Sequence, residues 1–154
     1  MLKAAIQQST FIPQAFYNQR LAPDQLRSLQ NRKLRAMVQH AWMNSPFYRA
    51  KFQAAGLTPD DIQTGEDLMK LPPTTKAEIQ KAGNDQVLAR GFSPANIIDE
   101  ATSGSSGKVL HIYHSHEAFN HYFAFAFRHL TSIGYRPWQR VAYTSFDQLM
   151  PLPW

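Results

Sequence analysis

The 154-residue chain contains no cysteine. This absence excludes disulfide bonds, thiolate metal sites and a cysteine nucleophile. No stretch approaches the roughly 18 consecutive apolar residues that indicate a membrane-spanning helix, and residues 1–11 lack the apolar core of a secretory signal peptide. Hydrophobic residues make up 44% of the chain, which is enough for a folded core. We therefore expect a folded, cytoplasmic protein with no membrane partner.

Acidic residues are scarce in the first third of the chain. Residues 1–51 hold eight Lys/Arg and a single acid, Asp24, whereas residues 52–154 hold eight Lys/Arg and ten Asp/Glu. The net charge of +5 is therefore an N-terminal property. Such a cluster can mark a nucleic-acid surface, but no aromatic and basic motif accompanies it. We interpret it as the solvated face of an amphipathic helix and predict no nucleic-acid partner.

Residues 23–91 show a pattern of short helices separated by strong breakers. Apolar residues recur at spacings of three to five from Leu26 to Trp42, which predicts a helix with Pro23 and Asp24 in its first turn and an end before Pro46. A second helix is predicted from Phe47 to Ala55, with Gly56 as its cap. Further helical turns are predicted to begin at Thr58, at Thr64 and at Thr75, the last with Glu78 in a capping box.

After Gly91 the pattern changes to strands. Residues 96–99 and 109–113 are rich in β-prone side chains, a helix over roughly 116–133 is capped by Ser115, and residues 140–144 are a third strand candidate. This order indicates the α/β class. We divide the chain into an N-terminal arm (1–22), a helical subdomain (23–91), and the beginning of an α/β domain (92–154) on which the helical subdomain packs. So few strands would leave a sheet edge open, so we expect that domain to be incomplete here.

The helix predicted over 116–133 is apolar on most sides. It carries Tyr122, Phe123, Phe125 and Phe127 among alanines. Such a helix is normally buried between a sheet and its neighbours, so we predict core packing for these rings. Contact with an aryl ligand is the alternative interpretation.

Five of the six histidines lie between residues 111 and 129. His111 and His114 differ in parity along a strand and would face opposite sides. His116 and His121 are separated by one residue more than the His-Glu-x-x-His motif allows. We therefore predict no metal site among them.

The segment from Thr102 to Lys108 is the strongest chemical signal. Its seven residues supply two glycines, four hydroxyl groups and one lysine. Glycine lets the backbone approach a ligand closely, and successive backbone N–H groups form a concavity that binds anions. The spacing matches neither the Walker A motif nor G-x-G-x-x-G. The residues alone leave two interpretations open, a polyphosphate-binding loop and a polar hairpin turn.

The loop sequence resembles that of a known superfamily. Thr102-Ser103-Gly104-Ser105-Ser106-Gly107-Lys108 is similar to the phosphate-binding loop of AMP-forming adenylating enzymes, the acyl-CoA synthetases. Upstream segments resemble the phenylacetate–CoA ligase branch in order and spacing: Met37–Ala41, Ser45–Arg49, Ala55–Ile62 and Asp67–Pro72.

The resemblance implies an ATP-dependent ligase that adenylates a small aryl or other carboxylic acid and passes the acyl group to coenzyme A. ATP, Mg²⁺ and coenzyme A are the implied cofactors, and residues 92–154 would begin the ATP-binding domain. By position, Thr102, Ser103, Gly104, Ser105, Ser106 and Gly107 would hold the β- and γ-phosphates, and Lys108 would add positive charge or stabilise the loop. The family's proline after the lysine is Val109 here. The glycine-rich stretch near the acid site is absent from residues 144–149, which leaves the acid open.

The resemblance also implies that much of the active site lies outside this chain. The adenine contacts, the acid pocket and the catalytic lysine of such ligases are expected beyond Trp154, so we assign no catalytic residue and expect the 154-residue piece to be inactive alone. The alternative is a shortened, non-catalytic homologue that acts as a binding or oligomerisation module. A natural protein that ends at Trp154 and self-associates would favour that alternative.

Overall fold

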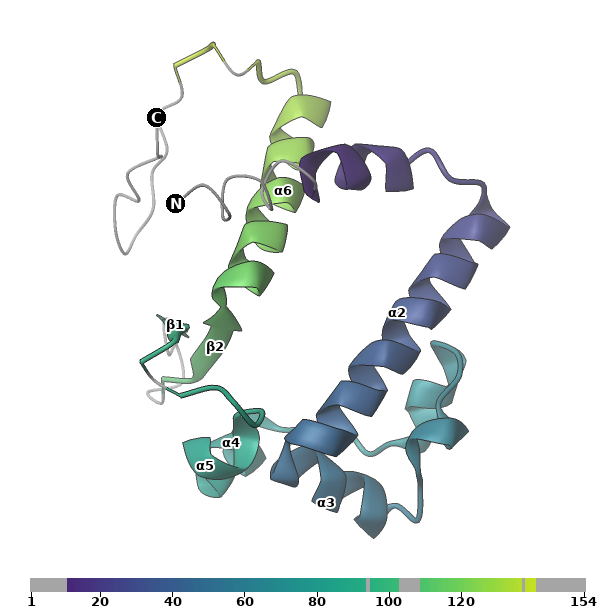
Figure 1. Ribbon diagram of the computed structural model, residues 1–154, viewed down its shortest axis with the longest axis vertical. Helices are drawn as coiled ribbons and strands as arrows, with labels where there is room; N and C mark the ends of the chain where they lie inside the picture. The colour runs from purple at the N-terminus through teal and green to yellow at the C-terminus, as the bar shows by residue number, and fades with distance from the viewer. Residues whose placement is uncertain (1–10, 94, 103–108, 137, 141–154) are drawn as a thin grey trace.

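The computed structural model describes residues 11–93, 95–102, 109–136 and 138–140 (Figure 1). A short helix over 11–18 comes first and a long helix follows it. A shorter helix, several helical turns, one hairpin and a second long helix come next. The elements are α2 (Pro23–Asn44), α3 (Pro46–Ala54), η1 (Pro59–Asp61), η2 (Glu66–Lys70), α4 (Lys76–Ala82), α5 (Asn84–Val87), β1 (Ile97–Ala101), β2 (His111–Ser115) and α6 (His116–Ser132). Within these ranges no helix combines the length and the apolarity needed to cross a bilayer.

The long helix α2 begins and ends where the sequence predicts. Pro23 occupies its first turn, and the Gln25 side chain accepts a hydrogen bond from the backbone N–H of Ala22 at 3.1 Å. Ser45 leaves the helical conformation immediately before Pro46. Arg49 of α3 then donates to the carbonyl oxygens of Trp42 (2.9 Å) and Met43 (2.7 Å). These carbonyls lack partners in the last turn of α2, so Arg49 joins the two helices at their corner.

A small apolar core joins the helices between residues 23 and 91, a segment called the helical subdomain from here on. Val38 of α2, Phe52 of α3 and Ile62 are buried. The Phe52 ring meets the Trp42 ring edge to face, with centroids 5.9 Å apart. Partly buried side chains complete the cluster: Leu34, Trp42, Leu57 and Leu71.

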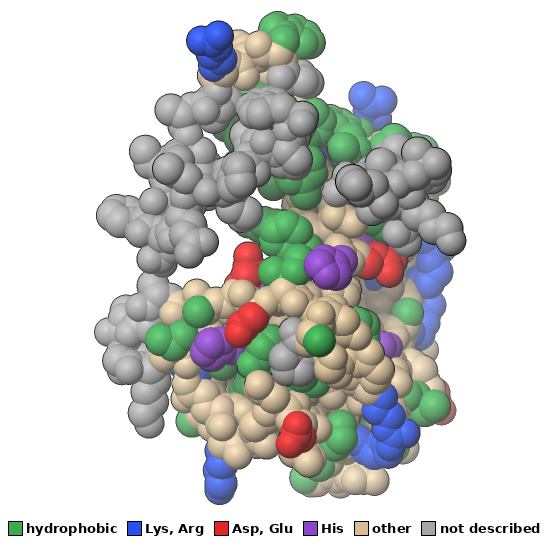
Figure 2. Space-filling view, turned by 60° about the vertical axis from the view of Figure 1, so that its left-hand side comes forward, with side chains coloured by type: hydrophobic (Ala, Val, Ile, Leu, Met, Phe, Trp, Pro, Cys, Tyr) green, Lys and Arg blue, Asp and Glu red, His purple; other side chains and the backbone are tan. Residues whose placement is uncertain are grey.

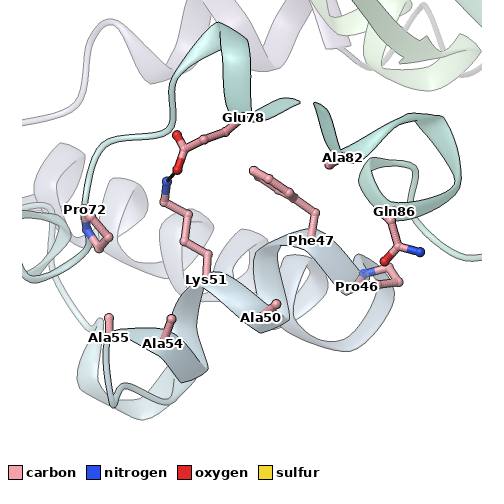
Figure 3. A pocket seen from close by; sticks show the side chains of 10 residues that line it. All are labelled: Pro46, Phe47, Ala50, Lys51, Ala54, Ala55, Pro72, Glu78, Ala82 and Gln86. Atoms are coloured by element: carbon pink, nitrogen blue, oxygen red, sulfur yellow. Dashed lines mark hydrogen bonds and ion pairs between the residues drawn. The ribbon is translucent and has the colours of Figure 1, made fainter. Parts of the chain in front are cut away.

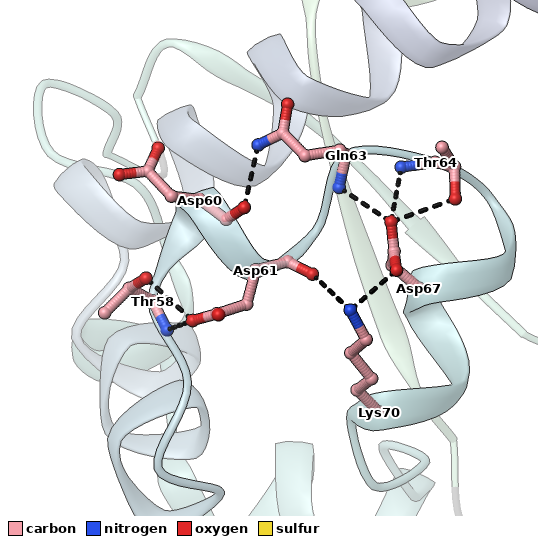
Figure 4. Close-up of polar contacts among 7 residues, drawn as sticks. All are labelled: Thr58, Asp60, Asp61, Gln63, Thr64, Asp67 and Lys70. Carbon is pink, nitrogen blue, oxygen red and sulfur yellow. Dashed lines mark hydrogen bonds and ion pairs between the residues drawn. The ribbon is translucent and has the colours of Figure 1, made fainter.

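The helical turns after α3 are built on pairs of threonine and acid three residues apart, as Figure 4 shows for two of them. Asp61 accepts from both the backbone N–H and the hydroxyl of Thr58, each at 2.8 Å. Asp67 accepts likewise from Thr64 at 2.8 and 2.9 Å, and Lys70 binds the other oxygen of Asp67 at 2.7 Å. The helix starts predicted at Thr58, Thr64 and Thr75 are confirmed.

The third pair, Thr75 and Glu78, also anchors α4 to α3. Glu78 accepts from the Thr75 backbone N–H (2.6 Å) and hydroxyl (2.8 Å), and it binds Lys51 of α3 at 3.1 Å. The Thr75 N–H, the Thr75 hydroxyl and Lys51 together lower the pKa of Glu78 from 4.5 to about 2. Hydrogen bonds from Thr58 lower the pKa of Asp61 in the same sense.

These lowered pKa values predict that the fold weakens in acid. Between about pH 4.5 and pH 2 the unfolded chain binds a proton at Glu78 that the folded chain does not, so stability falls as the pH falls through this window. We expect Glu78→Gln to flatten this part of the pH profile. Urea unfolding at a series of pH values measures the slope. An unchanged slope in the variant would contradict the assignment.

The helix over 11–18 lies against α6, at the upper end of the view in Figure 1. The rings of Phe11 and His121 have centroids 3.6 Å apart, and those of Phe16 and Phe127 meet edge to face at 6.5 Å. Ala15 and Ala124 are buried. The described part of the predicted arm is therefore a helix that contacts α6.

The predicted burial of α6 is wrong for most of its rings. Within the described ranges Tyr122 is 64% exposed, Phe125 44% and Phe123 38%. Figure 2 shows hydrophobic side chains gathered above the hairpin, where α6 lies. Composition and periodicity identify an apolar helix, but they do not show whether a second element covers each side. Among the described residues, the helix over 11–18 covers only one stripe of α6.

The predicted α/β class is confirmed in a coarser form. The described chain is rich in helix and carries a two-stranded antiparallel sheet, β1–β2. Of the third strand candidate, residues 141–144 lie outside the described residues.

Candidate functional site: the β1–β2 hairpin

The candidate loop connects the two strands of the hairpin. The register runs from Ile97 opposite Ser115 to Ala101 opposite His111. Ile and Tyr side chains at these positions favour a pleated, half-buried surface. The connection therefore spans Thr102 to Leu110, which includes all seven residues singled out by composition. Strand β2 begins at His111, two residues later than the sequence predicts.

Thr102 closes the base of this connection. Its backbone N–H donates to the carbonyl of Leu110 at 2.9 Å, and its hydroxyl accepts from the N–H of Leu110 at 3.0 Å. The N–H of Leu110 thus bonds to a side chain, which explains the later start of β2. The Thr102 hydroxyl keeps its own hydrogen to donate. The other six predicted phosphate contacts lie outside the described residues: Ser103, Gly104, Ser105, Ser106, Gly107 and Lys108.

Two histidine–carboxylate pairs lie on the hairpin, one on each face. His111 Nδ1 lies 2.9 Å from Asp99 Oδ1, and His114 Nε2 lies 3.1 Å from Glu100 Oε2. Each pair is diagonal across the ladder, where long side chains still meet. The prediction that His111 and His114 face opposite sides is confirmed. Asp99 and Glu100, the two acids that precede the loop, each contact a histidine side chain. In the described ranges, no three His, Asp or Glu side chains gather into a potential metal site.

Side-chain hydrogen bonds from α4 and to α5 tie the described part of the hairpin to the helical subdomain. Gln80 of α4 donates from Nε2 to the carbonyl of Val109 at 2.7 Å. The hydroxyl of Tyr113 donates to Asn84 Oδ1 of α5 at 2.9 Å. Sequence reasoning missed both ties. Gln80 lies on a polar helix face with no distinguishing pattern, and only the polar tip of Tyr113 signals that a partner is needed.

The short helix α5 is in turn fixed to the end of α2. Ser45 is buried, and its hydroxyl lies within hydrogen-bond distance of the carbonyls of Val87 (3.1 Å) and Gln86 (3.3 Å). The N–H of Arg90 donates to the carbonyl of Asn44 at 2.9 Å. A continuous set of contacts therefore runs from α2 through α5 to β2.

A groove of about 390 Å³ lies between the hairpin and the helices, next to the base of the connection. Its walls are mainly apolar and aromatic, and they include Tyr48, Ile79, Phe92, Leu110, Ile112 and Tyr113. A second hollow of about 440 Å³ lies between α3 and α4 (Figure 3). There, Lys51 donates to the carbonyl of Pro73 at 2.7 Å and pairs with Glu78. Lys51 and Glu78, the charged residues that line the second hollow, thus hold α4 against α3.

Comparison with known proteins agrees with the resemblance indicated by the sequence motifs. No protein-family model matches the chain. It is 31% identical over 118 residues to phenylacetate-coenzyme A ligase of Escherichia coli, an alignment that covers 77% of this chain and 27% of that protein. The chain is related to the phenylacetate–coenzyme A ligases. The enzyme of that name from Aromatoleum evansii is 40% identical over 62 residues, and that from Thermus thermophilus 26% identical over 117.

The predicted resemblance to phenylacetate–coenzyme A ligases is thus confirmed. The matches cover 13% to 27% of the length of these curated relatives, so the chain corresponds to a minor part of each. This agrees with the N-terminal portion indicated by the order of the motifs.

Proposed function

We propose that this chain is the phosphate-loop portion of an ATP-dependent, AMP-forming acid–CoA ligase. The relation to proteins named phenylacetate-coenzyme A ligase carries the proposal. The hairpin supports it, because its connection holds the glycine, hydroxyl and lysine residues that a polyphosphate needs. Thr102 and Gln80 hold the two ends of that connection by hydrogen bonds.

The reaction of such a ligase has two steps. A carboxylate oxygen of the acid attacks the α-phosphorus of ATP, the bond to the bridging oxygen of the β-phosphate breaks, and an acyl-adenylate and pyrophosphate form. The coenzyme A thiol then loses its proton to solvent and its sulfur attacks the acyl carbonyl, AMP leaves with the bonding electron pair, and a thioester remains. A small aryl acid is the substrate class that the relatives' names suggest.

The contribution of this chain is to hold the β- and γ-phosphates. Negative charge builds up on pyrophosphate as it departs, so donors already aimed at those oxygens lower the barrier. We assign this role to Thr102, the hydroxyls and backbone N–H groups of 103–107, and the charge of Lys108. Mg²⁺ would enter with the nucleotide, bound to phosphate oxygens.

The proposal predicts binding that depends on the polyphosphate. Calorimetric titration of the chain should show binding of MgATP and magnesium tripolyphosphate, and much weaker binding of AMP. Gly107→Val should abolish binding of both polyphosphates, because a branched side chain blocks close approach of the backbone to the ligand.

Gly65→Val is the matched control. Gly65 lies outside the hairpin, has an ordinary helical φ of −59°, and has open space around the position of an added Cβ. Circular dichroism of both variants tests whether they fold, and we expect both spectra to match that of the unaltered chain. Equal affinity for AMP and MgATP, or an unchanged affinity in Gly107→Val, would overturn the phosphate assignment. Acid-dependent exchange of pyrophosphate into ATP is expected to be absent from the isolated chain.

A further inference from the structure

The far end of the hairpin connection is held by a side chain from another element. Val109 directly follows Lys108, and its carbonyl lies outside the β1–β2 ladder, which ends at the pair Ala101–His111. Gln80 Nε2 donates to that carbonyl at 2.7 Å, across 29 positions of sequence. The near end is held by Thr102 within the hairpin itself. Gln80 therefore links the described end of the connection to the helical subdomain.

Gln80 is placed on a well-anchored helix. The Thr75–Glu78 capping box fixes the first turn of α4. Lys51, whose side chain is only 11% exposed, bonds both Glu78 and the carbonyl of Pro73 just before that turn. The amide of Gln80 is thus presented from a frame that α3 holds in place.

We propose that Gln80 is a positioning residue for nucleotide binding, which sets the C-terminal end of the phosphate loop through the carbonyl of Val109. This inference rests on the proposed function of that loop. Fixing the Val109 carbonyl in advance removes part of the conformational entropy cost of ligand binding, so the bound state forms at lower ligand concentration. Gln80 touches no phosphate itself, and the Tyr113–Asn84 bond supports the same hairpin from α5.

The chain offers a matched control for the test. Gln63 also donates from Nε2 to a backbone carbonyl, that of Asp60 at 2.9 Å, and it lies in the turn between η1 and η2. Gln80→Leu and Gln63→Leu each remove one amide donor and keep a side chain of similar size.

We expect Gln80→Leu to raise the Kd for MgATP about three- to tenfold, the effect of one lost hydrogen bond. Gln63→Leu should stay within about twofold of the unaltered chain. Amide hydrogen exchange without nucleotide provides a readout independent of binding. Exchange at Leu110 should be faster in Gln80→Leu and unchanged in Gln63→Leu.

The outcomes separate this inference from the function on which it rests. Suppose that MgATP binds and that Gly107→Val abolishes this binding. If Gln80→Leu then changes neither the affinity nor the exchange rate at Leu110, the positioning role is overturned and the phosphate loop stands. If Gln63→Leu weakens binding as much as Gln80→Leu, the effect is one of general stability and the positioning role is again overturned. If the unaltered chain does not bind MgATP, both are overturned.

Discussion

Replacement of Phe52 by alanine is expected to lower the free energy of unfolding by about 3–5 kcal/mol. Phe52 is 4% exposed and stands in the middle of the small core between Val38 and Ile62. Its removal takes away the apolar contacts of a whole ring and the edge-to-face contact with Trp42. Domains of this size are stable by about 5–15 kcal/mol, so the change removes a large share of the total.

The measurement is urea unfolding followed by circular dichroism of Phe52→Ala and of Phe123→Ala. Phe123 is 38% exposed on α6, away from this core, so its truncation should cost less than half as much. A loss below about 1 kcal/mol for Phe52→Ala would show that the cluster of Val38, Phe52 and Ile62 does not hold the subdomain together.

Gly83→Ala is expected to lower the free energy of unfolding by about 1–3 kcal/mol. Gly83 joins α4 to α5 with φ +75° and ψ 167°, a backbone conformation open almost solely to glycine. Nothing lies within 4 Å of the position of an added Cβ, so the whole effect is backbone strain and none of it is steric contact. The same strain would shift α5, and with it the Asn84 side chain that receives the Tyr113 hydroxyl.

Gly65→Ala separates strain from the general effect of a glycine substitution. Gly65 also has open space around an added Cβ, but its φ of −59° and ψ of −33° suit any residue. The substitution should leave stability unchanged or raise it by up to about 1 kcal/mol, because alanine reduces the freedom of the unfolded chain. Equal urea midpoints for the two alanine variants would contradict the role assigned to the backbone at Gly83.

Elements set by neighbouring residues could be predicted from the sequence. Pro46 determines where α2 ends, and threonine–acid pairs three residues apart begin the turns at Thr58, Thr64 and Thr75. Each of these signals lies within four consecutive residues. The threonine and the acid that bond to each other can therefore be recognised from the sequence alone. A hairpin turn is also one of the two interpretations of the Thr102–Lys108 segment, because its glycine and hydroxyl residues are neighbours in the sequence.

Features that depend on distant residues could not be predicted. The four residues of α5 are too few to show a helical period, and the tie from Gln80 to Val109 joins positions 29 apart. The exposure of Tyr122 and Phe125 depends on which elements cover α6, and the apolar pattern of the helix is the same whether or not it is covered. Of the candidate site, sequence reasoning found the loop and Thr102 at its near end, but not the Gln80 side chain that holds its far end.

The contact between the helix over 11–18 and α6 has a consequence for the order of events during synthesis. Phe11 meets His121, a residue 121 − 11 = 110 positions later in the chain. Ribosomes add about 5–20 residues each second, so the N-terminal helix waits on the order of 5–20 seconds for the surface on which it docks. The core around Phe52 has all its residues between Leu34 and Leu71 and is complete well before then. The nascent chain therefore carries Phe11 and Phe16 without this partner while the helical subdomain already has its own.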